Sequence, residues 1–305
     1  MNLWEVLLAR RPLVKFSWGF AVNLGKNASM PALERLPAVH EAVVSDRREP
    51  VADIVIIGIA AADLARNVRP GQFVMVVPPG GGTVSTALGV YEAEGDRLSL
   101  MLVVVGPRTR ELAALEPGAR VTLLGPLGNG FDLGTLGDDV ALVAGGVGIA
   151  PMLLPARELR ARGARVKLYY GARTASALVD ADLFTALGCD VAFSTDDGSR
   201  GHHGYVTDVL EREGASHTAI AACGPSPMLR SVGRVARTLD IRAQLSLEET
   251  FACGVGACWG CVVPLDRASA QAPHFPQPPP GERRDYVHAR ICKEGPVFWA
   301  HELRW

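Results

Sequence analysis

The chain has 305 residues, 48% of them hydrophobic, and its 31 basic and 32 acidic residues leave a formal net charge of −1. This length gives room for two or three domains, and the composition excludes a disordered chain and disfavours a nucleic-acid binder that works through bulk charge. No apolar run approaches the roughly 18 residues of a membrane helix, and the first residues lack the order of a signal peptide. We therefore expect a cytoplasmic protein without a membrane span.

The first third of the chain has the texture of a β-domain. Residues 1–38 show no clean hydrophobic period, and we treat them as an N-terminal extension of unknown role. Residues 39–135 contain short β-like runs separated by glycine and proline turns: His40–Ser45, Asp53–Ala60, Gln72–Val77, Arg97–Val105 and Arg120–Leu124. Short strands at this spacing, with a short helix at Thr109–Leu115, predict an antiparallel barrel or sandwich.

Residues 136–244 have a different pattern, in which strands alternate with helices. The expected strands are Val140–Ala144, Arg165–Tyr170, Asp190–Thr195 and Thr218–Cys223. The expected helices are Pro151–Arg162, Ser176–Leu187, Val206–Glu213 and Pro227–Leu239. This alternation indicates βαβ units and therefore a second domain built on a parallel sheet.

Residues 245–305 form a third segment, rich in cysteine and glycine, with a proline-rich insertion at 268–281. The chain has six cysteines, and four of them lie in this segment. In a reducing compartment such cysteines are thiols or metal ligands and not structural disulfides. Cys189 and Cys223 stand alone, and Cys189 has the context of a core residue. The clustering of the other four predicts a metal centre.

The clustered cysteines have the spacing C-x4-C-x2-C, followed by a distant fourth member: Cys253, Cys258, Cys261 and Cys292. This is the spacing of plant-type [2Fe–2S] proteins, whose cluster needs four thiolates. A loop that wraps a cluster needs residues able to take positive φ, which Gly254, Gly256 and Gly260 supply, and its N–H groups point at the sulfur atoms. The alternatives are a zinc site, which usually pairs two C-x2-C units, or a set of buried thiols.

A glycine turn links the strand expected at Val140–Ala144 to the helix that follows. The turn and the helix start contain Gly145, Gly146, Gly148, Ala150 and Pro151. Glycines let the backbone approach a pyrophosphate, the helix N-terminus offers free N–H groups, and Pro151 suits the first turn of a helix. Tight packing between strand and helix is the alternative explanation of these glycines.

A second buried strand ends in Cys223-Gly224-Pro225 and opens a helix that contains Met228. The carboxyl ends of parallel strands meet at one edge of a sheet, where ligands bind, so both turns should border one site. A thiol at that edge suits a position beside a nicotinamide ring. The alternative is that Cys223 is a small buried hydrophobic residue.

These motifs, in this order, resemble a known superfamily. A barrel followed by Gly145-Gly-x-Gly-x-Ala-Pro151 and Cys223-Gly-Pro-x-Pro-Met228 is similar to the ferredoxin–NADP reductase-like proteins. The C-terminal cysteine pattern narrows the resemblance to the electron-transfer subunit of class 1B dihydroorotate dehydrogenase. The likeness covers roughly residues 39–298. Further matches are Pro70–Val76, Gly125–Phe131, Thr195–Ser199, Gly204–Asp208, Leu245–Glu249 and Cys292–Phe298.

The resemblance implies an α+β multidomain fold: a six-stranded antiparallel flavin-binding barrel (39–135), an NAD-binding α/β domain (136–244) and a small [2Fe–2S] domain (245–305). It implies an NAD(P)H-dependent iron–sulfur flavoprotein that passes electrons from NADH through FAD and the cluster to a flavin-containing partner subunit, in a heterotetramer or larger complex. That partner would be a dihydroorotate dehydrogenase of pyrimidine biosynthesis. The alternatives are a subunit of another oxidoreductase, or a flavin-less paralogue that carries a cluster and tethers or senses a partner.

The resemblance also implies the residues of each cofactor site. The residues expected to bind the nicotinamide nucleotide are Gly145, Gly146, Gly148, Ala150, Pro151, Arg173, Asp196, Cys223, Gly224, Pro225 and Met228. Arg173 and Ser176 suit the 2′-phosphate of NADPH, whereas Asp196 and Asp197 disfavour it, so the choice between NADH and NADPH stays open.

The expected flavin site departs from the family pattern. The family carries an Arg-x-Pro/Tyr-Ser element on the barrel strand after Gly-Gln-Phe, and its arginine binds the flavin diphosphate. Here the stretch Thr83–Tyr91 contains no arginine. A second element remains as Gly106, Arg108, Thr109 and Arg110. Arginine makes strong charge-assisted contacts to phosphate, and a helix start adds free N–H groups, so we expect FAD to bind through this second element.

Overall fold

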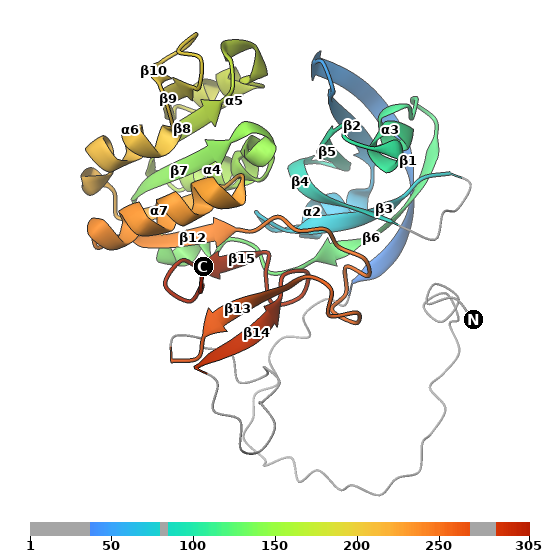
Figure 1. Cartoon of the computed structure of the whole chain (residues 1–305). Helices are drawn as coiled ribbons and strands as arrows, with labels where there is room; N and C mark the ends of the chain where they lie inside the picture. The colour runs from blue at the N-terminus through green and yellow to red at the C-terminus, as the bar shows by residue number, and fades with distance from the viewer. Residues whose placement is uncertain (1–36, 80–84, 269–284) are drawn as a thin grey trace, which may run out of the picture. The chain divides into compact units, whose positions relative to one another are not determined.

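Figure 1 shows the computed structural model of the chain, which describes residues 37–79, 85–268 and 285–305. Several sequence-based expectations fall outside these residues. They are the N-terminal extension up to residue 36, the first two residues of the Thr83–Tyr91 stretch, and residues 269–281 of the proline-rich insertion. Among the described residues, no helix is both long and apolar enough to cross a membrane.

Six antiparallel strands close into a barrel in the order β1-β2-β5-β4-β3-β6, which confirms the expected antiparallel barrel. The strands are β1 (Ala38–Val51), β2 (Ile54–Ala60), β3 (Phe73–Val77), β4 (Thr86–Glu94), β5 (Arg97–Val103) and β6 (Arg120–Leu127). Strand β2 is buried along nearly its whole length because both of its faces are covered. Ile57 points into the barrel core, whereas Ile56 belongs to the core of the second domain.

Two short helices pack against the barrel and contribute to its core. Leu64 of α2 (Ala62–Asn67) and Leu112 of α3 (Pro107–Ala113) are fully buried members of the barrel core. Helix α2 has no clear signal in the sequence. Helix α3 begins two residues before the expected start at Thr109, because proline is well suited to the first turn of a helix.

The second domain is a seven-stranded sheet in the order β10-β9-β8-β7-β11-β12-β15. Its strands are β7 (Asp139–Gly145), β8 (Arg165–Ala172), β9 (Asp190–Thr195), β10 (His202–His203), β11 (Ala219–Cys223), β12 (Arg242–Ser246) and β15 (Val297–Trp299). All neighbours are parallel except β15, which pairs antiparallel with β12. The expected parallel sheet is confirmed, and its last strand comes from the C-terminal segment.

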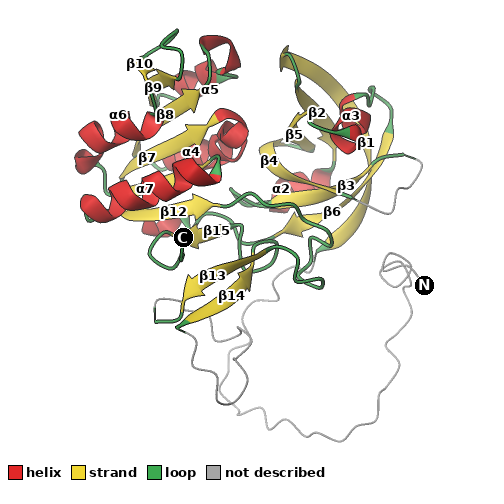
Figure 2. Ribbon diagram, in the orientation of Figure 1, coloured by secondary structure: helices red, strands yellow, loops and turns green. Residues whose placement is uncertain are grey.

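Helices cover both faces of this sheet (Figure 2). They are α4 (Leu153–Ala161) and α5 (Ala181–Ala186) on one face, and α6 (Val206–Glu213) and α7 (Ser226–Thr238) on the other. The expectation of one continuous helix over Ser176–Leu187 is wrong. The chain forms a single 3₁₀ turn, η3 (Ala175–Ala177), and then Asp180 adopts a left-handed backbone with φ of 53° before α5. A left-handed residue interrupts an α-helix, and aspartate tolerates that conformation better than most residues.

The C-terminal segment adds a two-stranded sheet, β13 (Val262–Asp266) and β14 (Tyr286–Arg290), after a long loop that holds three of the cysteines.

The barrel and the nucleotide domain share a core. Ile56 and Met101 of the barrel lie in one buried cluster with Ile149 and Met152 of the second domain. The buried side chain of Gln244 on β12 also contacts the segment that connects β6 of the barrel to β7 of the nucleotide domain. It forms hydrogen bonds with the backbone N–H and C=O of Asp132 in that segment, at 2.8 and 2.9 Å.

Candidate cofactor sites

The two turns expected to border one site lie side by side at the carboxyl edge of the sheet. Strands β7 and β11 are parallel neighbours, and Cys223 is in register with Ala144. A Cβ on Gly148 would lie 2.2 Å from the carbonyl oxygen of Cys223, and one on Gly145 would lie 2.6 Å from Sδ of Met228. These two glycines therefore let the two turns pack against each other.

Gly146 has a different environment. Its φ is +54°, and a Cβ there would meet no atom within 4 Å, so its backbone faces open space. The chain continues as the 3₁₀ helix η2 (Gly146–Met152), and α4 starts only at the buried Leu153. The expected helix start at Pro151 is therefore wrong, because Pro151 lies inside η2. The backbone N–H groups that follow the carboxyl end of β7 therefore belong to η2.

Cys223 is 1% exposed and donates a hydrogen bond from Sγ to Oε1 of Glu248 at 3.6 Å. Burial, followed by the negative charge of Glu248, raises the pKa of this thiol well above its usual value. Burial of the carboxyl group also raises the pKa of Glu248, although the residue as a whole is exposed and its bond with the thiol acts in the opposite direction. Cys223 is thus a protonated thiol at neutral pH. The sequence predicted no role for Glu248, which appeared only within Leu245–Glu249, one of the segments that resemble the family.

Two further loops meet at the same edge of the sheet. The backbone N–H of Asp196 bonds to the carbonyl of Ala172 at 3.1 Å, and that of Asp197 bonds to the carbonyl of Arg173 at 3.3 Å. Arg173 and Asp196 are both exposed. Asp197 accepts hydrogen bonds from the N–H and hydroxyl of Ser199 at 3.0 and 2.6 Å, and these bonds lower its pKa. The structure thus brings Arg173 and Asp196 together on adjacent loops.

The second flavin element forms the first turn of α3. Thr109 Oγ1 accepts hydrogen bonds from the N–H groups of Val105 and Gly106 at 3.0 and 3.1 Å, so its hydroxyl fixes the turn. Arg108 pairs with Glu111 at 3.4 Å on the surface. Arg110 is exposed, and within the described part of the chain it has no ion pair. It is the arginine of this element that is available for a phosphate.

Strand β4 carries small residues where the family has its flavin contacts. Leu88 and Val90 point into the barrel core, so Ala87 and Gly89 face outward. A Cβ on Gly89 would meet no atom within 4 Å. This face of β4 is therefore open and lacks a cation of its own between Ser85 and Tyr91.

The cysteine loop is fixed against the barrel. The ring of Phe251 lies 5.0 Å from that of Phe73 on β3, and a Cβ on Gly254 would lie 2.5 Å from Sδ of Met75 on the same strand. Positive φ occurs at Gly254 (68°) and Gly256 (78°), as expected. The expectation for Gly260 is wrong, because Trp259 takes the left-handed conformation there, with φ of 58°.

The sulfur atoms of this loop accept backbone hydrogen bonds. Sγ of Cys253 accepts from Ala257 and Cys258 at 3.3 and 3.4 Å, and Sγ of Cys261 accepts from Cys292 at 3.5 Å. Burial opposes ionisation of Cys253, but these N–H groups prevail and lower its pKa to about 7. Burial and Cys261 raise the pKa of Cys292 to about 12. Within the described residues no three His, Cys, Asp or Glu side chains form a metal-ligand group, so the four-cysteine set stays a prediction.

Known proteins share this architecture. Residues 142–234 match the family model of the oxidoreductase NAD-binding domain. The structure of an NADH-dependent reduced ferredoxin–NADP oxidoreductase, studied for flavin-based electron bifurcation, superposes with a TM-score of 0.73 at 25% identity and covers 87% of this chain and 90% of that one. A ferredoxin–NADP⁺ reductase from Neisseria gonorrhoeae, with bound FAD and NADP, shares the fold with a TM-score of 0.58 at 19% identity, over 66% of this chain and 91% of its own. Fold and site together define an NAD-binding oxidoreductase of the ferredoxin reductase type.

The curated relatives identify the family. A protein from Caldanaerobacter subterraneus subsp. tengcongensis is 33% identical over 77% of this chain and 87% of its own length. One from Geobacillus thermodenitrificans is 33% identical over 88% of this chain and 98% of its own length. Both are electron transfer subunits of dihydroorotate dehydrogenase B (NAD(+)), and a probable one from Methanothermobacter thermautotrophicus is 36% identical over 79% of this chain. The chain belongs to this family of electron transfer subunits.

Proposed function

We propose that this chain carries electrons between a nicotinamide nucleotide and a catalytic dihydroorotate dehydrogenase subunit, through FAD and a [2Fe–2S] cluster. The observation that carries the proposal is the packing of the cysteine loop on β3 of the barrel, through Gly254 on Met75 and Phe251 on Phe73. This packing supports a short path between a flavin on the barrel and a cluster in the loop. The relatives' name specifies NAD(+), so in the assembled enzyme NAD⁺ would accept the electrons of dihydroorotate through the same cofactors that carry electrons from NADH in the direction expected from the sequence.

The nucleotide would bind at the joined turns. The N–H groups at the start of η2, around the open Gly146, would receive the pyrophosphate, since such groups favour anions. Cys223 and Glu248 would lie at the nicotinamide end, and the raised pKa of the thiol keeps its proton on Sγ. A neutral thiol beside the ring offers a small apolar surface that excludes water without adding a charge.

The residues present fit FAD on the barrel. The open face at Gly89 leaves room beside β4. Arg110, in the middle of α3, supplies an exposed cation for the diphosphate, because β4 has no cation of its own between Ser85 and Tyr91. FAD, when bound, exchanges a hydride with nicotinamide and single electrons with an iron–sulfur centre. The role of this chain is to hold the diphosphate and to keep β4 facing the carboxyl edge of the sheet, where the nucleotide would bind. We call this edge the nucleotide edge.

The residues of the loop fit a [2Fe–2S] cluster. Thiolate ligands need N–H donors and a backbone that wraps closely, and the loop supplies both through Ala257, Cys258 and the left-handed Gly254 and Gly256. Cys253 contacts Cys258, and Cys261 contacts Cys292, so we propose that each pair binds one iron. We also place the subunit in the cytoplasm, because four cysteine ligands must stay reduced.

The test is to purify the chain anaerobically, alone and with its catalytic partner. Iron, sulfide and flavin analysis should find two irons per chain with FAD, as expected for one [2Fe–2S] cluster. The complex should reduce NAD⁺ when given dihydroorotate, and the isolated chain should oxidise NADH with an artificial acceptor. A chain that holds iron but takes up no flavin even with FAD supplied during expression would contradict the proposal. It would instead favour the cluster-bearing tethering module.

A further inference from the structure

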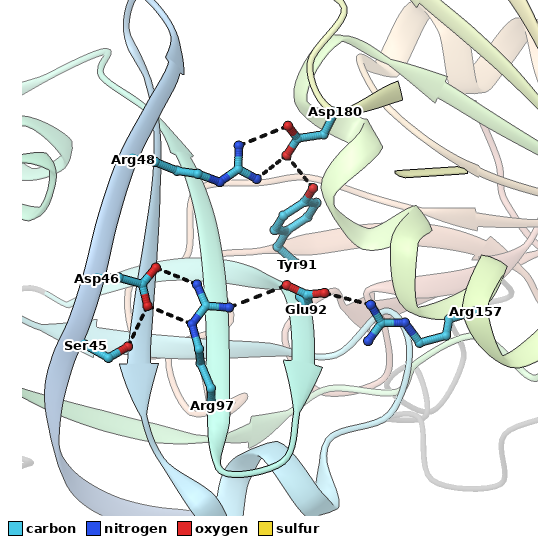
Figure 3. A network of polar contacts seen from close by, with 8 residues as sticks. All are labelled: Ser45, Asp46, Arg48, Tyr91, Glu92, Arg97, Arg157 and Asp180. Carbon is cyan, nitrogen blue, oxygen red and sulfur yellow. Dashed lines mark hydrogen bonds and ion pairs between the residues drawn. The ribbon is translucent and has the colours of Figure 1, made fainter. Parts of the chain in front are cut away.

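A polar network outside the cofactor sites joins the barrel to the nucleotide domain (Figure 3). The carboxylate of Asp180, which precedes α5, accepts two hydrogen bonds from the guanidinium of Arg48 on β1, one of them at 3.0 Å. It also accepts one from the hydroxyl of Tyr91 on β4 at 2.5 Å. The Asp180 side chain is 14% exposed. One largely enclosed carboxylate thus contacts two strands of the barrel.

A second link lies one residue further along β4. Glu92 pairs with Arg157 of α4 at 2.7 Å and with Arg97 of β5 at 3.5 Å. Arg97 in turn makes a bidentate contact with Asp46 of β1 at 2.6 and 2.7 Å. Figure 3 shows these contacts as two sets that meet at the neighbouring residues Tyr91 and Glu92, so β4 connects two elements of the nucleotide domain to β5 and β1.

Two backbone irregularities make the network possible. Consecutive side chains of a regular strand point to opposite faces, yet Tyr91 and Glu92 both reach the nucleotide domain. The pairing of β4 with β5 skips Tyr91, between Val90–Leu100 and Glu92–Ser99, and such a bulge re-aims a side chain. On the other side, Asp180 holds φ of 53° and ψ of 23°. A non-glycine residue keeps this conformation where its surroundings hold it, as Arg48 and Tyr91 do here.

We propose that Arg48, Tyr91 and Asp180 form a latch that sets the distance between β4 and the nucleotide edge, and that Tyr91 and Asp180 are positioning residues for hydride transfer. The inference rests on the proposed function. Tyr91 lies on the strand whose outward face at Ala87 and Gly89 is open, and Asp180 lies in the connection that leaves the carboxyl end of β8. Hydride transfer requires the reacting atoms to be held about 3–3.5 Å apart, so this contact acts on the geometry that decides the rate.

The test uses the complete subunit with Tyr91→Phe and Asp180→Asn, which remove one hydroxyl and one charge with little change of shape. Asp96→Asn is the matched control, because the exposed Asp96 pairs with Arg66 of α2 on the barrel side of the molecule. Rapid mixing with NADH should show flavin reduction at saturating NADH slowed about 10-fold in both latch variants and unchanged in the control. NADH affinity should change less than about 2-fold, since the nucleotide contacts remain. The Tyr91→Phe/Asp180→Asn variant should be no slower than Asp180→Asn, because both residues act through one contact.

Wild-type rates in both latch variants, or effects that multiply in the double variant, would overturn the positioning role. The positioning role would also be overturned if the rate of flavin reduction fell only in proportion to the fraction of folded protein, as measured by a thermal melt. A wild type that contains no flavin contradicts the proposed function and not the latch. In that case amide hydrogen exchange decides: β4 and α5 should exchange faster in Asp180→Asn than in Asp96→Asn. Equal exchange in the two variants would overturn the latch itself.

Discussion

At the scale of single residues, the site depends on side chains whose proton state is set by burial. Cys223 is an example, because burial and Glu248 keep it a neutral thiol. Cys223 bonds to a carboxyl group at the end of β11, whereas Cys253 and Cys261 accept backbone N–H bonds in the C-terminal segment, and this difference in place and partner separates Cys223 from the clustered cysteines. The sequence placed Cys223 at a strand end, but it could not supply Glu248 as its partner, because the two residues lie 25 positions apart and meet only through the pairing of β11 with β12.

Replacing Cys223 by Ala should slow the reduction of the protein by NADH several-fold, because a small cavity replaces the surface that meets the nicotinamide ring. The cluster spectrum should stay unchanged. Stopped-flow reduction by NADH measures the first, and visible absorption measures the second. Cys189→Ala is the control, since Cys189 is also buried and lies in the core. Unaltered NADH kinetics in Cys223→Ala would remove the residue from the site.

Replacing any one of Cys253, Cys258, Cys261 or Cys292 by Ser should bleach or destabilise the cluster, because each loss leaves an iron under-coordinated. Iron content and the visible spectrum after anaerobic purification are the measurements. Cys189→Ser should keep both. Zinc in place of iron, or an intact spectrum in Cys292→Ser, would contradict the assignment.

At the scale of elements, the two nucleotide-edge turns work as one unit because glycines let them touch. Gly148 carries no side chain where the carbonyl of Cys223 approaches, and a backbone oxygen cannot move aside as a flexible side chain can. Gly146, two residues earlier, is open and left-handed. Gly148 is therefore required by close contact with another turn, whereas Gly146 is favoured by its left-handed backbone. The two causes predict different losses of stability when each glycine is replaced by alanine.

Gly148→Ala should destabilise the fold by about 3 kcal/mol or more, because its Cβ would overlap the Cys223 carbonyl and force the two turns apart. Gly146→Ala meets no atom and should cost only about 1 kcal/mol of backbone strain. Urea unfolding of the two variants measures the difference. Equal losses of stability would show that the contact between the turns is not the reason for Gly148.

The start of α3 is the second element with a testable role. Replacing both Arg108 and Arg110 by Ala should release FAD while the cluster stays in place, because β4 offers no cation to the diphosphate between Ser85 and Tyr91. Arg110→Ala alone should account for most of the loss, since Arg108 is engaged with Glu111. Flavin released on gel filtration, against iron retained, is the measurement. Arg66→Ala on α2 is a control for the loss of a surface arginine. Full flavin retention in the double variant would place the diphosphate elsewhere.

At the scale of the molecule, carboxylates form ion pairs within the barrel and between the barrel and the nucleotide domain. The hydrogen bonds from Arg97 lower the pKa of Asp46. Burial raises the pKa of Asp180, but the bonds from Arg48 and Tyr91 outweigh it, and the pKa lies below its usual value. A carboxyl group whose folded pKa is depressed stabilises the fold above its unfolded pKa of about 3.9, and that contribution is lost as the pH falls through the folded value.

The free energy of unfolding should therefore be flat near neutral pH and decline below about pH 4, as these carboxylates take up protons. Urea unfolding between pH 3 and 7 measures the decline. Asp46→Asn and Asp180→Asn should each lower stability at pH 7 and make the decline shallower, because one depressed carboxyl group is gone. A decline as steep as that of the wild type in both variants would show that other groups control the acid response.

The sequence alone indicated an antiparallel barrel followed by a parallel sheet, because hydrophobic period and turn chemistry are local signals. Strand β9 and helix α6 begin and end at the expected residues for this reason. The spacing of the cysteines and the paired turns at Gly145 and Cys223 also indicated the chemistry, since those patterns are short and specific.

Only the tertiary structure decided the rest, because it depends on contacts between residues far apart in the chain. The break before α5 belongs to this group, since Asp180 is held by residues of the barrel, and so does the entry of β15 into the nucleotide sheet. The role of Gly148 was hidden for the same reason, because the atom that excludes a side chain is the carbonyl of Cys223. Local propensity says which segments form strands and turns. Long-range packing decides which residues of those turns meet.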